Sequence, residues 1–487
     1  MRTLLQLLFL SASLAPAQSV LVTRGAVPFQ VFQRDASNLA NIHLEGSSDG
    51  KSVEARLVAA GRAVDGFDWK QMATVSQKAW SGDLAGVPTG GPYRIELRAQ
   101  GGATTATVDG ILVGDLWVLA GQSNMEGVGN LENTPLPSAL VNSLDQTDAW
   151  VAAADPLHRL PDAIDPVHWG KNAQGERERL SGPALDKWIA NRKKGAGAGL
   201  PFAMEMVRRT GVPIGLLPCA HGGTSMDQWS PALKAKGGDS LYGAMLRRFK
   251  LAGGRVTGLL WYQGESDASA DAEPMFSFKF MELINSVRSD FGQPELPFYY
   301  VQIGRHVTGA GGKEWNAIQQ DQLTVESQVP HVGMVTCADC SLDDGIHVST
   351  KDHVVLGQRL ANLACHDLFP AKAGCGALQS GPRPVGARME GHRIVVEFKG
   401  VNGHLRSAGR LNGFAILDST GKIVPTIYSQ RVSETNPNVV ELLLGGEKLP
   451  DTPLLGYGIG FGRDMYVNLS DDAGMAAPVF GPLPIKH

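Results

Sequence analysis

The stretch over 114–127, GDLWVLAGQSNMEG, limits the fold of this chain more than any other part of the sequence. Its apolar run over 116–120 predicts a buried strand, and the run ends at Gly121, directly before the polar residues that include Ser123. A serine in a glycine-flanked turn after such a strand lies at the carboxyl edge of a sheet, where open α/β folds place their sites. The pattern is not G-x-S-x-G, so it does not predict the nucleophile elbow of the usual α/β hydrolases.

Further apolar runs alternate with amphipathic helical patterns along the middle of the chain. Such alternation favours a parallel sheet with helices on both faces. We therefore expect an α/β fold, a flavodoxin-like three-layer α/β/α domain with a five-stranded parallel sheet, over 111–378. The five expected strands lie at 115–121, 213–220, 256–263, 297–304 and 331–338.

Short alternating runs on both sides of this region predict two β-rich domains, over 18–110 and 379–487. The segment over 128–199 differs from its surroundings, because it has patchy periodicity and many Pro, Gly, Trp, His and charged residues. Long irregular segments in compact domains are usually functional, so we expect an insertion over the site. His158, His168 and Trp169 are its candidates for substrate contact, although a structural role is the more common one for such residues.

The residues over 1–17 have the pattern of a cleavable signal peptide, with Arg2, a short apolar run and an Ala-Pro-Ala end. This pattern predicts a secreted or periplasmic protein. The formal net charge is −4 and no basic stripe is present, which argues against nucleic acid or an anionic membrane as a partner.

Five cysteines are compatible with one or more disulfides in an oxidising compartment. Cys365 and Cys375 are the preferred pair, a Cys337–Cys340 ring is possible, and Cys219 is expected to be a buried free thiol. The chain has no second C-x-x-C and no clustered histidines, so no zinc site and no cofactor are expected.

A serine nucleophile needs a base within hydrogen-bond reach and an acid that orients the base. His347, in the sequence SLDDGIHVST after the last expected strand, is the best candidate for the base. Asp344 lies three residues earlier in the same loop and is the preferred acid. Glu265 is the alternative acid, because it follows another expected strand end.

An oxyanion hole needs preorganised donors, and glycine allows a backbone N–H to approach closely. The candidates are the backbone N–H of Ser123, that of Gly222 or alternatively Gly223 in CAHGGTSMDQW, and the side-chain amide of Gln263 in LLWYQGESDA. Asp343 and Asp267 are expected to be solvated or capping carboxylates.

The four motifs GQSNMEG, HGGTSMDQW, WYQGESDA and DGIH, in this order, resemble the sequence blocks of the SGNH (GDSL-like) hydrolase superfamily. Within it they are similar to the sialate O-acetylesterase and acetylxylan esterase group. FQVFQRD (29–35) and VNLSDDAGMAAPVFGP (467–482) also look like terminal segments of that group.

The resemblance implies a serine esterase that removes acetyl groups from an O-acetylated sugar or glycan without a metal. It implies Ser123 as nucleophile, His347 as base and Asp344 as acid, with Gly222 and Gln263 as oxyanion donors. A xylan or other plant-polysaccharide deacetylase is the alternative enzyme. A non-catalytic carbohydrate-binding protein and, less so, a scaffold protein are the alternatives of another class.

Overall fold

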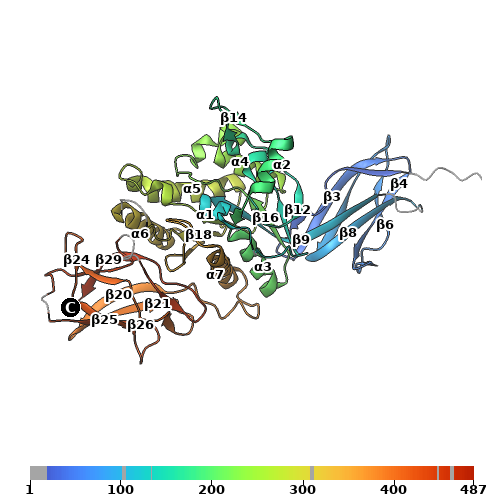
Figure 1. Ribbon diagram of the computed structural model, residues 1–487. Helices are drawn as coiled ribbons and strands as arrows, with labels where there is room; N and C mark the ends of the chain where they lie inside the picture. The colour runs from blue at the N-terminus through green and yellow to red at the C-terminus, as the bar shows by residue number, and fades with distance from the viewer. Residues whose placement is uncertain are drawn as a thin grey trace, which may run out of the picture.

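The computed structural model describes residues 19–100, 102, 106–132, 134–307, 312–446, 449–460 and 466–486 (Figure 1). The expected signal peptide over 1–17 lies outside these residues. Three clusters of buried apolar side chains succeed one another from the N-terminal strands to the C-terminal strands, and the largest fills the middle of the molecule.

The central sheet contains six parallel strands, one more than the sequence predicted. The path runs β12-β11-β16-β9-β17-β18-β19, in which only the edge strand β12 is antiparallel to its neighbour. The sixth parallel strand, β11, comes from the segment over 128–199, where proline and glycine interrupt the hydrophobic pattern. The strands are β9 (Ala106–Gly121), β11 (Val141–Leu144), β12 (Trp150–Ala152), β16 (Ile214–Pro218), β17 (Gly258–Tyr262), β18 (Phe298–Gln302) and β19 (Val332–Thr336).

The strand β9 is 16 residues long and belongs to two parts of the molecule. Its first half pairs with the N-terminal strands β8, antiparallel, and β2, parallel, whereas its second half pairs with β16 and β17. The expected domain boundary between residues 110 and 111 therefore falls inside a continuous strand. The Arg34 guanidinium reinforces this connection by donating to both carboxylate oxygens of Asp115, at 2.8 and 2.9 Å.

The N-terminal region consists of antiparallel strands around its own apolar cluster (Figure 1). One group, β1-β3-β7, forms a separate sheet, and the others continue the sheet that contains β9. The strands are β1 (Val20–Arg24), β2 (Val31–Gln33), β3 (Leu39–Ser48), β4 (Ser52–Ala59), β5 (Arg62–Ala63), β6 (Lys70–Thr74), β7 (Ala79–Pro88) and β8 (Gly90–Ala99).

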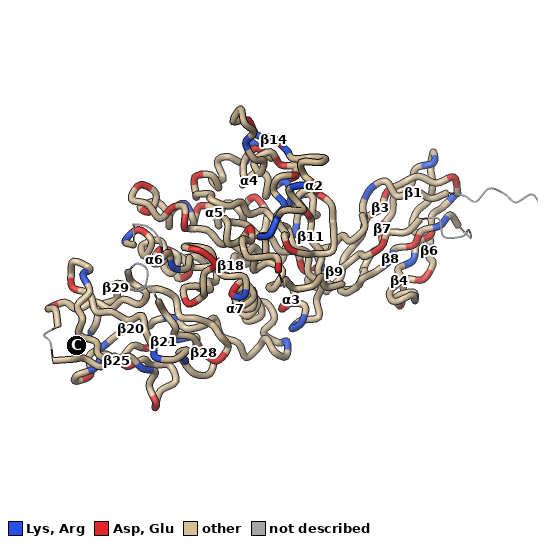
Figure 2. The backbone as a smooth tube through the Cα atoms, viewed as in Figure 1, with Lys and Arg blue, Asp and Glu red and all other residues tan. Residues whose placement is uncertain are grey.

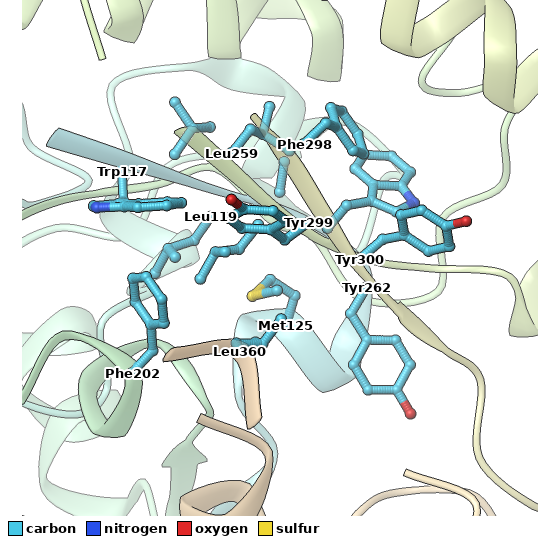
Figure 3. Close-up of a cluster of buried hydrophobic side chains, with 14 of the residues drawn as sticks. Trp117, Leu119, Met125, Phe202, Leu259, Tyr262, Phe298, Tyr299, Tyr300 and Leu360 are labelled. Atoms are coloured by element: carbon cyan, nitrogen blue, oxygen red, sulfur yellow. The ribbon is translucent and has the colours of Figure 1, made fainter. Parts of the chain in front are cut away.

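Helices cover both faces of the central sheet, because its strands are apolar on both sides. On one face Trp117 packs against Phe202 of α3 with ring centroids 4.9 Å apart (Figure 3). On the other face Phe280 of α5 packs against Tyr300 with ring centroids 5.0 Å apart. Gly258 lies beside Trp117, and a Cβ there would come within 2.4 Å of the indole ring. The helices are α1 (Ser123–Glu126), α2 (Gly182–Asn191), α3 (Gly199–Thr210), α4 (Leu241–Leu251), α5 (Phe276–Phe291), α6 (Gly312–Gln328) and α7 (Thr350–Leu368).

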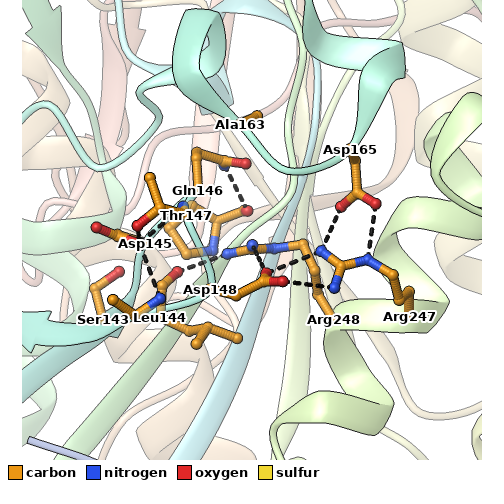
Figure 4. Close-up of polar contacts among 12 residues, drawn as sticks. Ser143, Leu144, Asp145, Gln146, Thr147, Asp148, Ala163, Asp165, Arg247 and Arg248 are labelled. Atoms are coloured by element: carbon orange, nitrogen blue, oxygen red, sulfur yellow. Dashed lines mark hydrogen bonds and ion pairs between the residues drawn. The ribbon is translucent and has the colours of Figure 1, made fainter. Parts of the chain in front are cut away.

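The segment over 128–199 is fastened to the central domain by a buried network of charges (Figure 4). Arg247 of α4 forms ion pairs with both Asp148 and Asp165, with closest distances of 2.7 Å. The neighbouring Arg248 is fully buried and donates to the carbonyl oxygen of Leu144 at 2.6 Å. Short elements make up the rest of this segment and the loops near it: β10 (Gly129–Asn130), β13 (Gly170–Lys171), β14 (Arg177–Glu178), β15 (Lys194–Ala196), and the 3₁₀ turns η1 (Leu160–Asp162), η2 (Pro166–His168), η3 (Pro231–Asp239), η4 (Glu265–Asp267) and η5 (Glu273–Met275).

The C-terminal region is β-rich and packs directly on the central domain. The side chain of Gln302, at the end of β18, bonds both the N–H and the carbonyl of Val479, at 2.9 and 2.8 Å. Arg383 pairs with Glu326 of α6 at 2.6 Å. The strands are β20 (Arg383–Glu390), β21 (Arg393–Lys399), β22 (Leu405–Ser407), β23 (Phe414–Leu417), β24 (Ile423–Val424), β25 (Ile427–Val432), β26 (Val439–Leu444), β27 (Leu454–Tyr457), β28 (Leu469–Asp471) and β29 (Phe480–Lys486).

The cysteines are arranged as the preferred pairing predicted. A disulfide joins Cys365 near the end of α7 to Cys375, and Cys219, Cys337 and Cys340 are free and buried. Among the described residues, no helix combines the length and the apolar character that crossing a membrane requires.

We predict that Gly121→Ala destabilises the fold strongly. Gly121 has φ = 127°, and a Cβ there would lie 2.2 Å from the carbonyl oxygen of Tyr262, across the β9–β17 pair. Backbone strain of about 1–3 kcal/mol would add to a similar cost of overpacking. The free energy of unfolding, measured by urea denaturation, tests this expectation.

Gly211→Ala is the matched control. Gly211 also has a positive φ, 71°, but a Cβ there would meet no atom within 4 Å. Its substitution should therefore cost only the conformational strain, about 1–2 kcal/mol. Equal losses in the two variants would contradict the proposed close contact at Gly121.

Candidate active site

The four sequence motifs meet at one edge of the central sheet. The strands β9, β16, β17 and β19 are parallel, so their carboxyl ends lie at the same edge. Ser123 follows β9, Gly222 follows β16, Gln263 follows β17 and His347 lies in the loop between β19 and α7.

The structure brings together the three side chains expected to form a catalytic group. Nε2 of His347 lies 3.1 Å from Oγ of Ser123, and Nδ1 of His347 lies 2.7 Å from Oδ2 of Asp344. With its proton on Nδ1, the imidazole donates to Asp344 and presents Nε2 as an acceptor to the serine hydroxyl. Ser123 is half-buried and the His347 side chain is 26% exposed, so substrate can reach both.

Asp344 is held by the loop that it shares with the histidine. Its Oδ1 accepts from the backbone N–H groups of Ile346 and His347, at 3.0 and 2.9 Å. Partial burial would raise the pKa of Asp344, but the hydrogen bond from the His347 ring and these backbone N–H groups outweigh it and lower the pKa to about 2. The carboxylate is therefore ionised at neutral pH and stabilises a positive charge on the imidazole.

Glu265, the alternative acid, bonds Asn124 rather than the His347 ring and so supports the loop that carries the histidine. Its Oε1 accepts from the Asn124 side chain at 3.0 Å, and Oδ1 of Asn124 accepts from the N–H of Val348 at 3.1 Å. Burial raises the pKa of Glu265. Asn124 thus joins the nucleophile turn, the Glu265 turn and the histidine loop.

Gly222 lies against the nucleophile, as expected for an oxyanion donor. A Cβ at Gly222 would lie 3.5 Å from Cβ of Ser123, so a side chain there would fill the space beside the hydroxyl. The backbone N–H of Gly222 donates to Oε2 of Glu126 at 2.8 Å. The next residue, Gly223, has φ = 69°.

Glu126 is a site residue that the sequence analysis missed. It lies three residues after Ser123 in the short helix α1, and this spacing places both side chains on one helical face, which was the available signal. Burial raises the pKa of Glu126, opposed by the Gly222 N–H and by the charge of Arg192. Nη2 of Arg192 lies 3.9 Å from the carboxylate.

Gln263 differs from its expected role as an oxyanion donor. Its fully buried amide nitrogen donates to the carbonyl oxygen of Thr224 at 3.0 Å and to the carboxylate of Asp267. Both amide hydrogens are therefore engaged within the protein. We expected Asp267 to be a solvated or capping carboxylate. It is buried, not solvated, and it accepts from the backbone N–H of Met226 at 2.9 Å.

Asp343 and two of the three candidates in the long segment, His158 and His168, have structural roles. Asp343 accepts from the Thr350 N–H and hydroxyl, and so caps α7. His158 is fully buried, and burial lowers its pKa to about 3. His168 is also buried, and its Nδ1 lies 3.0 Å from Nδ1 of His221, the residue before Gly222. His168 therefore contacts the neighbour of the glycine turn but not solvent.

Comparisons with known proteins show the family of this chain. A family model described as carbohydrate esterase, sialic acid-specific acetylesterase matches residues 113–366, more than half of the chain. A probable carbohydrate esterase of Arabidopsis thaliana is 28% identical over 273 residues, which cover 50% of this chain and 88% of the relative. Human sialate O-acetylesterase is 26% identical over 319 residues, 56% of this chain and 58% of the relative, so the match spans less than two thirds of that protein.

A solved structure of a carbohydrate acetylesterase from Xanthomonas citri superposes with a TM-score of 0.62 at 21% identity. The match covers 94% of this chain and 99% of that one, and it shows a shared fold. The resemblance seen in the four motifs is thereby confirmed. This chain belongs to the carbohydrate esterase family of the sialic acid-specific acetylesterases.

Proposed function

We propose that this protein removes O-acetyl groups from sugars by serine catalysis. The observation that carries the proposal is the continuous contact from the Ser123 hydroxyl through the His347 ring to the Asp344 carboxylate. Family membership supports the reaction class, and the site opens to solvent beside Ser123.

In the first step His347 accepts the hydroxyl proton on Nε2 as Oγ of Ser123 attacks the acetyl carbonyl carbon. Asp344 stabilises the imidazolium that forms. The tetrahedral intermediate then collapses, the bond to the sugar oxygen breaks, and His347 returns its proton to that oxygen. The sugar alcohol leaves and the acetyl group remains on Ser123.

In the second step His347 takes a proton from water, which attacks the acetyl-serine carbonyl. Collapse of this second intermediate releases acetate, and the proton passes back to Oγ of Ser123. Both steps develop negative charge on the same oxygen, so they depend on the same donors.

We assign the oxyanion donors to the backbone N–H groups of Ser123 and Gly222. Ser123 is the first residue of α1, and the first N–H groups of a helix have no intrahelical partner. The Gly222 N–H is bonded to Glu126, so the substrate oxygen has to replace that carboxylate. In this assignment Gln263 supports the glycine turn, because its amide hydrogens are bonded to the Thr224 carbonyl oxygen and to the Asp267 carboxylate.

We also propose that the protein is exported. The pattern over 1–17 supports this, and the Cys365–Cys375 disulfide is of a kind that persists in oxidising compartments.

Ser123→Ala should lower acetate release by at least about 1,000-fold, because no other group can form the acetyl intermediate. Release is measured with 4-nitrophenyl acetate, a 9-O-acetylated sialoside and acetylated xylan in parallel. Ser327→Ala, an exposed hydroxyl on α6, is the control and should retain full activity. Full activity in Ser123→Ala would refute the mechanism, and the substrate ranking of the wild type separates the sialate and xylan alternatives.

Asp344→Asn should lower kcat on the order of 1,000-fold, because the amide cannot stabilise the imidazolium. Glu265→Gln should lower kcat by about tenfold or less, since Gln keeps an acceptor for Asn124. Steady-state kinetics on the same ester measure both. A collapse confined to Glu265→Gln would make Glu265 the acid and contradict this assignment.

Glu126→Ala should raise kcat/KM on 4-nitrophenyl acetate by about two- to tenfold, the worth of one hydrogen bond that substrate no longer has to displace. Glu126→Gln keeps the contact with Gly222 and loses the charge, so its gain should be smaller. A residue with a purely structural role would lower activity and stability together. A loss of kcat with unchanged thermal stability would instead show that Glu126 assists the reaction.

A further inference from the structure

The site lies between two pockets whose charge differs from that of the chain as a whole. We call the first the α2 pocket and the second the His221 pocket. The chain has a net charge of −4, yet together the linings contain seven Lys and Arg residues and two carboxylates. The basic residues are Lys187, Arg192, Lys193 and Lys194 in the α2 pocket and Lys171, Arg177 and Lys236 in the His221 pocket.

The α2 pocket has a volume of about 700 Å³ and is built mainly on α2 and the chain that follows it. The Arg192 guanidinium lies over the ring of Trp188, 4.6 Å from its centroid, which fixes the plane of the cation. A planar guanidinium held in this way can bond both oxygens of a carboxylate. Glu126 is the only acidic residue of the lining.

The His221 pocket has a volume of about 360 Å³ and also has an aromatic wall. The ring of Trp169 is fixed by a hydrogen bond from Nε1 to the Ala163 carbonyl oxygen at 2.8 Å. Asp239 is its only carboxylate, and it lies 3.9 Å from Arg177. Both volumes fall within the range of about 300–1,000 Å³ that is usual for small-ligand sites.

The nucleophile borders the glycine turn that separates residues lining the two pockets. Glu126 lines the α2 pocket and accepts from the Gly222 N–H, whereas His221 and Thr224 line the His221 pocket on the other side of the same glycine turn. Gly222 in turn borders Ser123. Figure 2 shows Lys and Arg around α2 and β14, with Asp and Glu interspersed, and both elements come from the segment over 128–199.

We propose that the substrate is a glycan chain with carboxylate-bearing sugars, which runs across Ser123 and places charged units in both pockets. This inference rests on the proposed deacetylase function of Ser123. The acetylated sugar lies over the glycine turn, its neighbours stack on Trp188 and Trp169, and their carboxylates bind the lysines and arginines. A single acidic sugar would use one pocket, and a neutral xylan chain would use neither set of charges.

The test compares O-acetylated oligogalacturonides, from monomer to hexamer, with acetylated xylo-oligosaccharides of equal length. We expect kcat/KM for the acidic hexamer to exceed that of the acidic monomer and of the neutral hexamer by about tenfold or more. The advantage should shrink with added salt, because it is electrostatic. Equal kcat/KM values for acidic and neutral chains would overturn the proposal.

Paired charge reversals show whether both pockets take part. K187E/K194E changes the α2 pocket, K171E/K236E changes the His221 pocket, and K372E/K399E changes exposed lysines outside both. We expect each pocket variant to lower the ratio of kcat/KM for the acidic hexamer to that for 4-nitrophenyl acetate by about tenfold, and the control to leave it unchanged. A loss in only one pocket variant would mean that a single charged sugar is bound, which contradicts a chain that spans the site.

Failure of this inference and failure of the proposed function are distinguishable. If the wild type hydrolyses 4-nitrophenyl acetate in a Ser123-dependent way but shows no preference for acidic chains, only the inference is refuted. Absence of serine-dependent activity on every ester would refute the proposed function and the inference with it.

Discussion

The pairing of β9 with β16 and β17 is the interaction on which the rest of the structure depends. These parallel ladders align the carboxyl ends of the strands, so that residues from distant parts of the sequence meet at one edge. At the end of β9, Gly121 lies close to the Tyr262 backbone. The chain leaves the sheet after this glycine, and two residues later Ser123 contacts His347. Because β9 also pairs with β8 and β2, part of the N-terminal region is continuous with the site's own sheet, whereas β1, β3 and β7 form a separate sheet.

Glu126 adds a second carboxylate to the site, beside the proposed group of Ser123, His347 and Asp344. A carboxylate on the Gly222 N–H holds negative charge where the proposed reaction develops its own. In the proposed mechanism, Glu126 occupies the Gly222 donor of the free enzyme, and substrate binding exchanges that carboxylate oxygen for the acetyl oxygen. Arg192 connects this exchange to the α2 pocket, because it lies close to Glu126 and lines the same pocket.

The long segment over 128–199 combines a rigid base with an exposed outer part. Its base is locked to α4 through Asp148, Asp165 and the buried Arg248, and removing one member of such a network leaves an unpaired charge that typically costs about 3–5 kcal/mol. Its outer part consists of α2, which has no fully buried residue, and the residues that follow it, and together these carry the basic side chains of one pocket. The base of the segment is thus fixed to the central domain, while its outer part exposes positively charged side chains to solvent.

The sequence by itself determined the alternation of apolar strands and amphipathic helices, because strand periodicity is a local property. It also proposed Ser123, His347 and Asp344 from strand ends and loop spacing, and the structure brings these three side chains into contact. It did not predict β11, whose four residues are too short for a periodic signal inside a proline-rich segment. Tertiary structure alone decided that Gln263 donates inward, that Glu126 holds the Gly222 N–H, and that Glu265 reaches Asn124 rather than His347. These outcomes depend on hydrogen-bond partners brought together from different strands, and no spacing along one segment specifies which partner a buried polar group meets.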